Sequence, residues 1–162
     1  AFNKGIDPTF GELADKKTSI FPGAAADPSC RNKRSLKNRI IRKKEAGAQF
    51  IQTQMVMEKE NLIEFCEEVS NPLEIPVIAG VFLLKSYKNA LFINKYVPGA
   101  NIPEKILNRL KDAKDPLQEG IQIAAEQAQD FIQIANGIHV MAVKAEHLIP
   151  EILKKANINL EY

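Results

Sequence analysis

The amides Gln52 and Gln54 are the residues of this sequence whose type and spacing most clearly indicate chemistry. They stand in the stretch Ala46–Gln54 (AGAQFIQTQ), which we expect to join a helix end to a buried strand. Strand side chains alternate between faces, so Phe50, Gln52 and Gln54 share one face, where an apolar core would not select amides. In a parallel α/β barrel the C-terminal strand ends open on the active-site mouth. We therefore expect Gln54 to lie at such a mouth and to contact a ligand.

A run of cations is the second candidate for chemistry, although the formal net charge of the whole chain is only +2. Three interpretations are open: a solvated helix face, a nucleic-acid surface, or a site for a phosphate-bearing cofactor. The stretch has no aromatic residue to stack on bases, which argues against nucleic acid. It begins in a loop at the C-terminal end of a predicted strand, where barrel enzymes bind ligands. The cations are Arg31, Lys33, Arg34, Lys37, Arg39, Arg42, Lys43 and Lys44.

The cysteines and His139 give weaker indications of a functional site. Cys30 and Cys66 fall in different predicted elements without CxxC spacing, which predicts two reduced thiols, no metal site and no nucleophile. His139 lies on the last predicted strand; it could act as a base, but a packed, hydrogen-bonded histidine is the simpler interpretation. The apolar runs are far shorter than the roughly 20 residues of a membrane span, and no signal or transit segment is evident. We therefore expect a cytoplasmic protein that binds no membrane.

The elements that would position these residues alternate strand with helix, which is typical of α/β folds with parallel strands. An eight-stranded α/β barrel needs about 250 residues, and this chain has 162. The expected fold class is therefore α/β, a parallel (β/α) TIM-barrel type with four strand-helix units, half of an eight-stranded barrel. The predicted strands are Thr18–Gly23, Phe50–Val56, Ile75–Phe82 and Gly137–Val143. The predicted helices are Ser35–Glu45 ended by Gly47, Lys59–Val69, a helix capped by Ser86 that runs to Tyr96, Pro103–Leu110, Pro116–Ala135 and Glu146–Lys155.

Four segments, in order, resemble one family. Lys43–Gln54 (KKEAGAQFIQTQ) resembles the signature K-x-x-AGA-x-F-I-x-TQ of the methylenetetrahydrofolate reductases. Asn3–Asp7 resembles the family's N-x-G-x-D loop, Phe21–Pro28 its GAAxxP strand end, and Ile75–Val81 its PIIPGI strand. The resemblance implies that residues 1–162 form a single domain, the C-terminal half of the barrel, as a fragment or as one part of a split enzyme.

The resemblance also implies a cofactor and its contacts. Methylenetetrahydrofolate reductases bind FAD in the barrel mouth, and their flavin-contacting lysine falls on Lys43, beside a further contact position at Arg42. Asp27 matches, less closely, a flavin contact after the GAA strand end. A cation at such positions would offset pyrophosphate charge.

The family's substrate contacts are partly changed. Gln54 keeps the folate-contacting glutamine, while Asn89 stands in place of a second glutamine. The arginine of the TLNR segment is lost from Ala142–Ala145, where Lys144 could supply a charge from one position away. On the flavin side, Leu36 replaces an aspartate and the loop Ser29–Arg34 is shortened. The resemblance thus implies a folate or a related pterin carrier as substrate, held by an altered set of contacts.

The implied reaction passes hydride from NAD(P)H or another electron donor to FAD, and then to methylenetetrahydrofolate to give the methyl form. The family's general acid, a glutamate, would lie upstream of Ala1, so we expect no catalytic residue in this chain. Glu45, Glu58 and Glu60 flank helices and are not substitutes. Function would then require the N-terminal half, in the same polypeptide or as a separate chain. Two open sheet edges further predict an oligomer, either a homodimer of halves or a complex with that half.

Two other hypotheses are open. The chain could be a non-catalytic partner subunit of a one-carbon or electron-transfer complex, with the changed ligand positions serving docking. It could also be an unrelated phosphate-binding barrel enzyme of aldolase type. That hypothesis requires a Schiff-base lysine on a strand, and none stands out.

Overall fold

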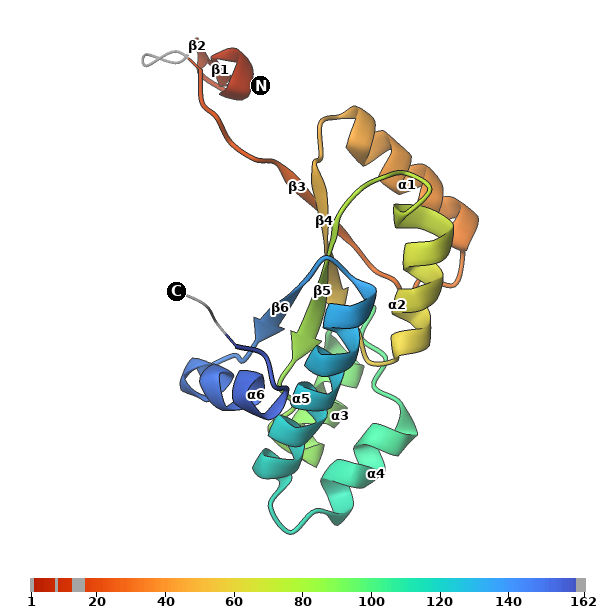
Figure 1. Cartoon of the computed structure of the whole chain (residues 1–162), viewed down its shortest axis with the longest axis vertical. Helices are drawn as coiled ribbons and strands as arrows, with labels where there is room; N and C mark the ends of the chain where they lie inside the picture. Colours follow the sequence, from red (N-terminus) through yellow and green to blue (C-terminus); the bar gives the residue numbers. More distant parts are fainter. Residues whose placement is uncertain (1, 8, 13–16, 160–162) are drawn as a thin grey trace.

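The computed structural model describes residues 2–7, 9–12 and 17–159, and its centre is a four-stranded sheet (Figure 1). All neighbouring strands are parallel, and their spatial order follows the chain, β3-β4-β5-β6. A barrel adds its strands in sequential order, whereas a doubly wound sheet reverses direction at a switch point. The predicted class, a parallel (β/α) barrel type with four strand-helix units, is therefore confirmed. The strands are β3 (Gly23–Ala26), β4 (Phe50–Met55), β5 (Val77–Phe82) and β6 (Gly137–Met141).

The first strand of this sheet is shorter and later than predicted. We expected Thr18–Gly23, but the strand is Gly23–Ala26, and residues 18–22 have no regular structure. The cause is the length of the neighbouring strand. β4 begins at Phe50 opposite Gly23, so residues before Gly23 have no strand to pair with beyond one hydrogen bond from Gln49 N–H to the Pro22 carbonyl. The prediction of this strand's position was wrong, although its place in the order of elements was right.

The helices agree with the predictions to within a few residues, and local caps set their ends. Asn32 accepts a hydrogen bond from Ser35 N–H at 2.9 Å, so α1 starts before the predicted Ser35. Ser86 caps α3 through Asn89 N–H, and Gly47 follows α1 at a φ of 105°, both as predicted. The helices are α1 (Lys33–Glu45), α2 (Lys59–Phe65), α3 (Tyr87–Tyr96), α4 (Glu104–Asp112), α5 (Pro116–Ile134) and α6 (Ile149–Lys155).

Two predicted helices change their winding near an end. The segment predicted as one helix to Val69 continues from α2 as a π-helical turn, η2 (Cys66–Ser70), closed by Asn71 N–H on the Cys66 carbonyl. The last helix opens with a 3-10 turn, η3 (Glu146–Leu148), before α6. Pro150 lies in the first turn of α6, where its missing N–H costs no hydrogen bond.

The main core lies between one face of the sheet and helices α1, α2, α5 and α6. Ile51, Ala79 and Val81 point to these helices and are fully buried. The opposite face is covered much less, since Ile78 and Phe82 are only half-buried. In a closed barrel this second face would be the interior.

A second cluster of apolar side chains joins α3 and α4 to α5 at the C-terminal ends of the strands. Residues 97–103 link α3 to α4, and α4 is an additional helix inserted between β5 and β6, where α3 and α5 also lie. At the other end, η1 (Phe2–Lys4) and the short strands β1 (Ile6–Asp7) and β2 (Gly11–Glu12) lie away from the sheet (Figure 1).

Candidate functional site

The open face of the sheet carries a polar pair that spans three strands. Gln52 Nε2 on β4 lies 2.9 Å from His139 Nδ1 on β6, with β5 between them. The contact is possible because β5 presents Gly80 opposite His139, so no side chain intervenes there. A Cβ at Gly80 would approach the Gln54 carbonyl oxygen to 2.8 Å. Glycine at position 80 is therefore required by the nearby backbone of β4, and its lack of a side chain leaves room for the Gln52–His139 contact.

Gln54 lies one pleat closer to the strand end and is half-buried. Its Oε1 accepts a hydrogen bond from Met55 N–H at 3.0 Å, where the pairing of β4 with β5 shifts register. This fixes the amide with its oxygen against the backbone. Among the described residues Gln54 Nε2 has no hydrogen-bond partner, so Gln54 can offer N–H donors to a ligand.

A cavity of about 660 Å³ lies beside these amides, at the C-terminal ends of β3 and β4 and under α1. This volume is within the range of small-molecule and cofactor sites. The cavity brings together three of the predicted site residues, Asp27, Lys43 and Gln54. Three others, Arg42, Asn89 and Lys144, do not line it. Its polar and sulfur-containing side chains include Asp27, Cys30, Arg39, Lys43, Gln52 and Gln54.

Lys43 and Asp27 are each held by the backbone near them. Lys43 Nζ donates to the Ala25 carbonyl of β3. Asp27 Oδ1 accepts from Ser29 N–H at 2.9 Å and so shapes the turn after β3. A Cβ at Gly99, in the link between α3 and α4, would lie 3.0 Å from Asp27 Oδ2. The insertion therefore reaches the rim of the cavity at Asp27.

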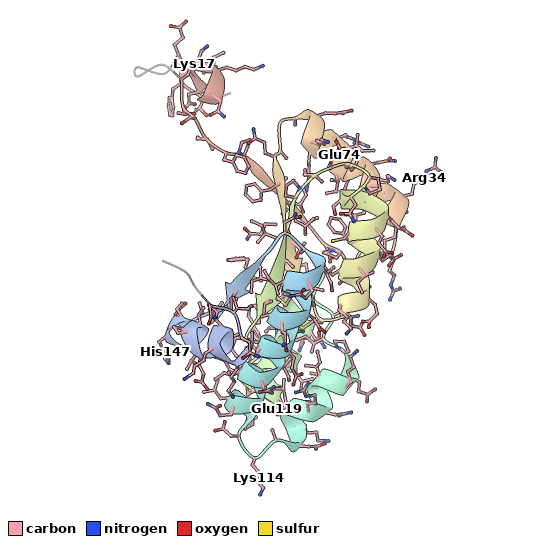
Figure 2. All side chains as sticks on the ribbon, viewed as in Figure 1. Lys17, Arg34, Glu74, Lys114, Glu119 and His147 are labelled. Carbon is pink, nitrogen blue, oxygen red and sulfur yellow. The ribbon has the colours of Figure 1, made fainter. Side chains whose placement is uncertain are left out.

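Arg39 is a site residue that sequence analysis named only as a member of the cationic run and did not single out. It lines the cavity one helical turn before Lys43, and its Nη2 lies 3.3 Å from Cys30 Sγ. The i, i+4 spacing of Arg39 and Lys43 places both on one face of α1, and this was the signal that could have identified it. Arg42 is exposed, and Arg34 points away from the body (Figure 2). Lys33 pairs with Glu64 on α2, and Lys44 donates to the Leu73 carbonyl. The run thus divides into cations that line the cavity, cations that bind neighbouring segments and cations in solvent.

Asn89 and Lys144 lie at the ends of β5 and β6 rather than in the cavity. Asn89 Oδ1 accepts from Lys85 N–H at 3.1 Å, and Asn89 N–H donates to Ser86 Oγ. This reciprocal pair caps α3 and leaves the Asn89 NH₂ group as the part able to reach a ligand. Lys144 is exposed and has a φ of 56°. Lys85 Nζ donates to the Val143 carbonyl at 2.9 Å, so a second cation stands at this strand end.

The loop after β6 is shaped by Glu146. Its Oε1 accepts from Lys144 N–H at 3.0 Å. Hydrogen bonds from the backbone N–H groups of Glu146 and Lys144 lower the pKa of the Glu146 carboxyl. This carboxylate is exposed, and its bond holds Lys144 in its left-handed conformation.

The donor set fits an anionic, aromatic or amide-bearing ligand better than a metal ion. Two cations, Arg39 and Lys43, can face phosphate groups, and the amides Gln52 and Gln54 can bind polar ring edges. Within residues 2–7, 9–12 and 17–159, no group of three or more His, Cys, Asp or Glu side chains could hold a metal ion. In the same part of the chain, no helix has both the length and the apolar character needed to cross a membrane.

Comparisons with known proteins agree with this chemistry. Residues 4–157 match the family model described as methylenetetrahydrofolate reductase. The chain is 32% identical over 133 residues to methylenetetrahydrofolate reductase 2 of Schizosaccharomyces pombe, covering 74% of this chain and 20% of the relative. It is 27% identical over 122 residues to methylenetetrahydrofolate reductase 2 of Saccharomyces cerevisiae, covering 70% of this chain and 20% of the relative. The chain thus spans about a fifth of the length of these curated relatives.

A solved structure supports the fold. It is an uncharacterized protein from Clostridium thermocellum, described as binding two copies of 5-methyl-5,6,7,8-tetrahydrofolic acid. It superposes with a TM-score of 0.66 at 21% sequence identity, covering 88% of this chain and 54% of that one. The four strand-helix units therefore correspond to about half of the solved chain.

Proposed function

The chain belongs to the methylenetetrahydrofolate reductase family, and from this premise we propose that it forms the C-terminal half of a flavin-dependent site that reduces methylenetetrahydrofolate, or a related pterin carrier, to the methyl form. The observation that carries the proposal is the cavity in which Asp27, Lys43 and Gln54 converge at the C-terminal ends of parallel strands. This is the edge at which barrel enzymes bind their ligands.

The cations of α1 would hold FAD. Arg39 and Lys43 lie on the cavity side of the helix, where a guanidinium and an ammonium offset the charge of a pyrophosphate. FAD, when bound, would supply the hydride chemistry, taking electrons from a nicotinamide or another donor and delivering them to the pterin carrier. Leu36, which replaces a family aspartate, lines the same cavity as Arg39. This supports flavin contacts at this end of α1 that differ from those of the family.

Gln54 would orient the pterin. Its Oε1 is bound by Met55 N–H, so its NH₂ group is left to donate to a ring nitrogen or carbonyl oxygen. The Clostridium thermocellum structure, described as binding two copies of 5-methyl-5,6,7,8-tetrahydrofolic acid, shares this fold and supports a reduced pterin as the ligand. Asn89 and Lys144 stand farther along the strand ends, where they would meet the distal part of such a carrier.

The proton needed at the pterin nitrogen would come from outside the described site. Asp27 is the acidic side chain that lines the cavity, and its carboxylate is bound to the turn at Ser29. We assign it a structural and cofactor-facing role. The general acid then belongs to the N-terminal half, supplied by the same polypeptide or by a separate chain. That half would join the sheet at its edges β3 and β6 and enclose the open face.

A non-catalytic partner subunit is the second candidate function. The observation in its favour is that Asn89 Oδ1 is bound in the cap of α3 and that Lys144 stands outside the cavity. Under this hypothesis the family fold is kept for docking, and neither flavin nor pterin binds.

Equilibrium titration of FAD into the full polypeptide that carries this chain, followed by flavin fluorescence, tests the proposal. Arg39→Met and Lys43→Met should each weaken FAD binding by about tenfold or more, since charge-assisted hydrogen bonds contribute about 1.5–3 kcal/mol. Lys37→Met, the same type of change on α1 outside the cavity, should have no effect. Gln54→Ala should leave FAD binding intact and weaken binding of 5-methyltetrahydrofolate. Wild-type protein that binds neither ligand beside its N-terminal half would support the non-catalytic function.

A further inference from the structure

Helix α3 has two apolar faces, and only one of them is buried. Ala90 and Ile93 pack into the second core cluster. On the other side Leu91, Phe92 and Tyr96 are 41%, 58% and 58% exposed. Large apolar side chains exposed side by side commonly mark an interaction surface. The outward face of α3 is therefore a surface that lacks a cover among the described residues.

The exposed face is ordered and positively charged. The Phe92 and Tyr96 rings lie 4.7 Å apart at an interplanar angle of 43°, and Lys95 Nζ stands 5.0 Å from the centre of the Tyr96 ring. Lys88 is exposed one turn before Phe92. The sequence of α3, YKNALFINKY, contains no acid. Exposed residues at positions 88, 91, 92, 95 and 96 follow the i, i+3, i+4, i+7, i+8 spacing of a docking stripe.

The strands of a second half of the barrel would not join beside this stripe. A second half adds strands at the two open edges of the sheet, β3 and β6. Helix α3 follows β5, which already has a strand on each side, and it packs on α4. New strands would therefore not pair beside β5, the strand that α3 follows.

The charge of the stripe also argues against a second copy of this chain. Two α3 helices packed face to face would bring the lysines of one against the lysines of the other, and like charges in such a contact are destabilising. An anionic membrane would attract the lysines, but three apolar side chains on a ten-residue helix bury little area in a bilayer. Paired Phe and Tyr rings bordered by cations are instead typical of protein interfaces.

We propose that the outward face of α3, formed by Lys88, Leu91, Phe92, Lys95 and Tyr96, is a docking site for an acidic amphipathic helix of a partner protein. The apolar side of the partner helix covers Leu91, Phe92 and Tyr96. Carboxylates on its flanks pair with Lys88 and Lys95. This inference is independent of whether the cavity under α1 binds flavin.

The test uses two synthetic helical peptides of about 16 residues, each with Leu and Phe at i, i+3, i+4, i+7 spacing. One carries glutamates on the flanks and the other carries lysines at the same positions. Binding to the full polypeptide is measured by isothermal titration calorimetry and located by amide chemical-shift changes. The glutamate peptide should bind with shifts centred on α3, and the lysine peptide should not bind. Lys88→Glu with Lys95→Glu should invert this preference.

Phe92→Ser should weaken binding of the glutamate peptide by about tenfold or more, as expected for a central aromatic anchor. Phe10→Ser is the matched control, because Phe10 is 87% exposed but lies outside α3. The proposal is overturned if both peptides bind equally, or if Phe10→Ser has the same effect as Phe92→Ser. It is also overturned if phosphatidylserine vesicles bind the stripe and the glutamate peptide does not, or if Phe92→Ser dissociates a homo-oligomer.

Discussion

At the scale of single residues, Gln52 has two roles: its amide contacts His139 across the sheet, and it also lines the cavity. The Gln52 amide and the His139 ring lie 2.9 Å apart, within hydrogen-bond distance across the sheet. The interpretation of His139 as a hydrogen-bonded histidine is confirmed. Its position on β6, opposite Gly80, also places the imidazole on the face that a closed barrel would enclose.

The two thiols should differ in reactivity. Burial raises the pKa of the Cys66 thiol, and Cys66 is only 5% exposed, whereas Cys30 lines the cavity. Because the thiolate is the reactive form, Ellman's reagent at pH 8 should label Cys30 quickly and Cys66 only after a denaturant is added. Cys30→Ser should abolish the fast phase. Equal rates for the two thiols in the native protein would contradict the burial of Cys66.

At the scale of elements, the packing of α5 against the end of β5 depends on one glycine. A Cβ at Gly120 would approach the Leu84 carbonyl oxygen to 1.8 Å, and the obstacle is backbone. Gly120→Ala should therefore lower the free energy of unfolding by about 2 kcal/mol or more, despite the better helix propensity of alanine. Urea denaturation measures the change. Gly137→Ala is the control, since nothing lies within 4 Å of a Cβ there. Equal stability of the two variants would mean that α5 can shift away from Leu84.

The contact between α4 and α5 carries the clearest pH dependence. Arg109 donates to Glu126 and to Glu119 at 2.6 Å, and its hydrogen bond to Glu126 lowers the pKa of that carboxyl from its ordinary 4.5. A lowered folded-state pKa means that this stabilisation is complete above pH 4.5 and disappears as the pH falls through the folded-state value.

Arg109→Met should accordingly destabilise the protein at pH 7 by only about 0.5–1 kcal/mol, because these charges are partly exposed and screened. The difference from wild type should shrink as the pH is lowered below 4.5. Urea denaturation at pH 7 and at pH 3, at low salt, measures it. A difference that persists unchanged at pH 3 would assign the effect to lost packing of the Arg109 side chain instead of its charge.

At the scale of the whole molecule, the sheet has two central strands and two edges. β4 and β5 each pair on both sides, whereas β3 and β6 each pair on one side among the described residues. Hydrogen exchange should therefore be slowest in Phe50–Met55 and Val77–Phe82 and faster in Gly23–Ala26 and Gly137–Met141. Mass spectrometry of exchanged peptides measures the order.

Addition of an N-terminal half should slow hydrogen exchange at both edges, since closing the barrel gives β3 and β6 each a new neighbouring strand. Protection of one edge only would indicate an open assembly. Unchanged exchange at both edges would contradict the proposal that a second half completes the sheet.

The sequence alone determined the order and type of the elements, because periodicity, glycines and caps are local signals. The cap at Ser86, the stop at Gly47 and the alternation around Gln52 and Gln54 could all be predicted from neighbours along the chain. The position of the first strand could not. Strand ends depend on a partner strand, and only the register with β4 starts this strand at Gly23.

Only the tertiary structure decided which side chains share a site. It brings Lys43 together with Asp27 and Gln54 but leaves Arg42, one position away in sequence, in solvent. It adds Arg39, and it joins Gln52 to His139 across 87 positions of sequence. Residue types set what chemistry is possible. Which side of a helix faces the cavity, and which side chains meet across a strand, depend on how the elements pack. Those are long-range contacts, and no local pattern specifies them.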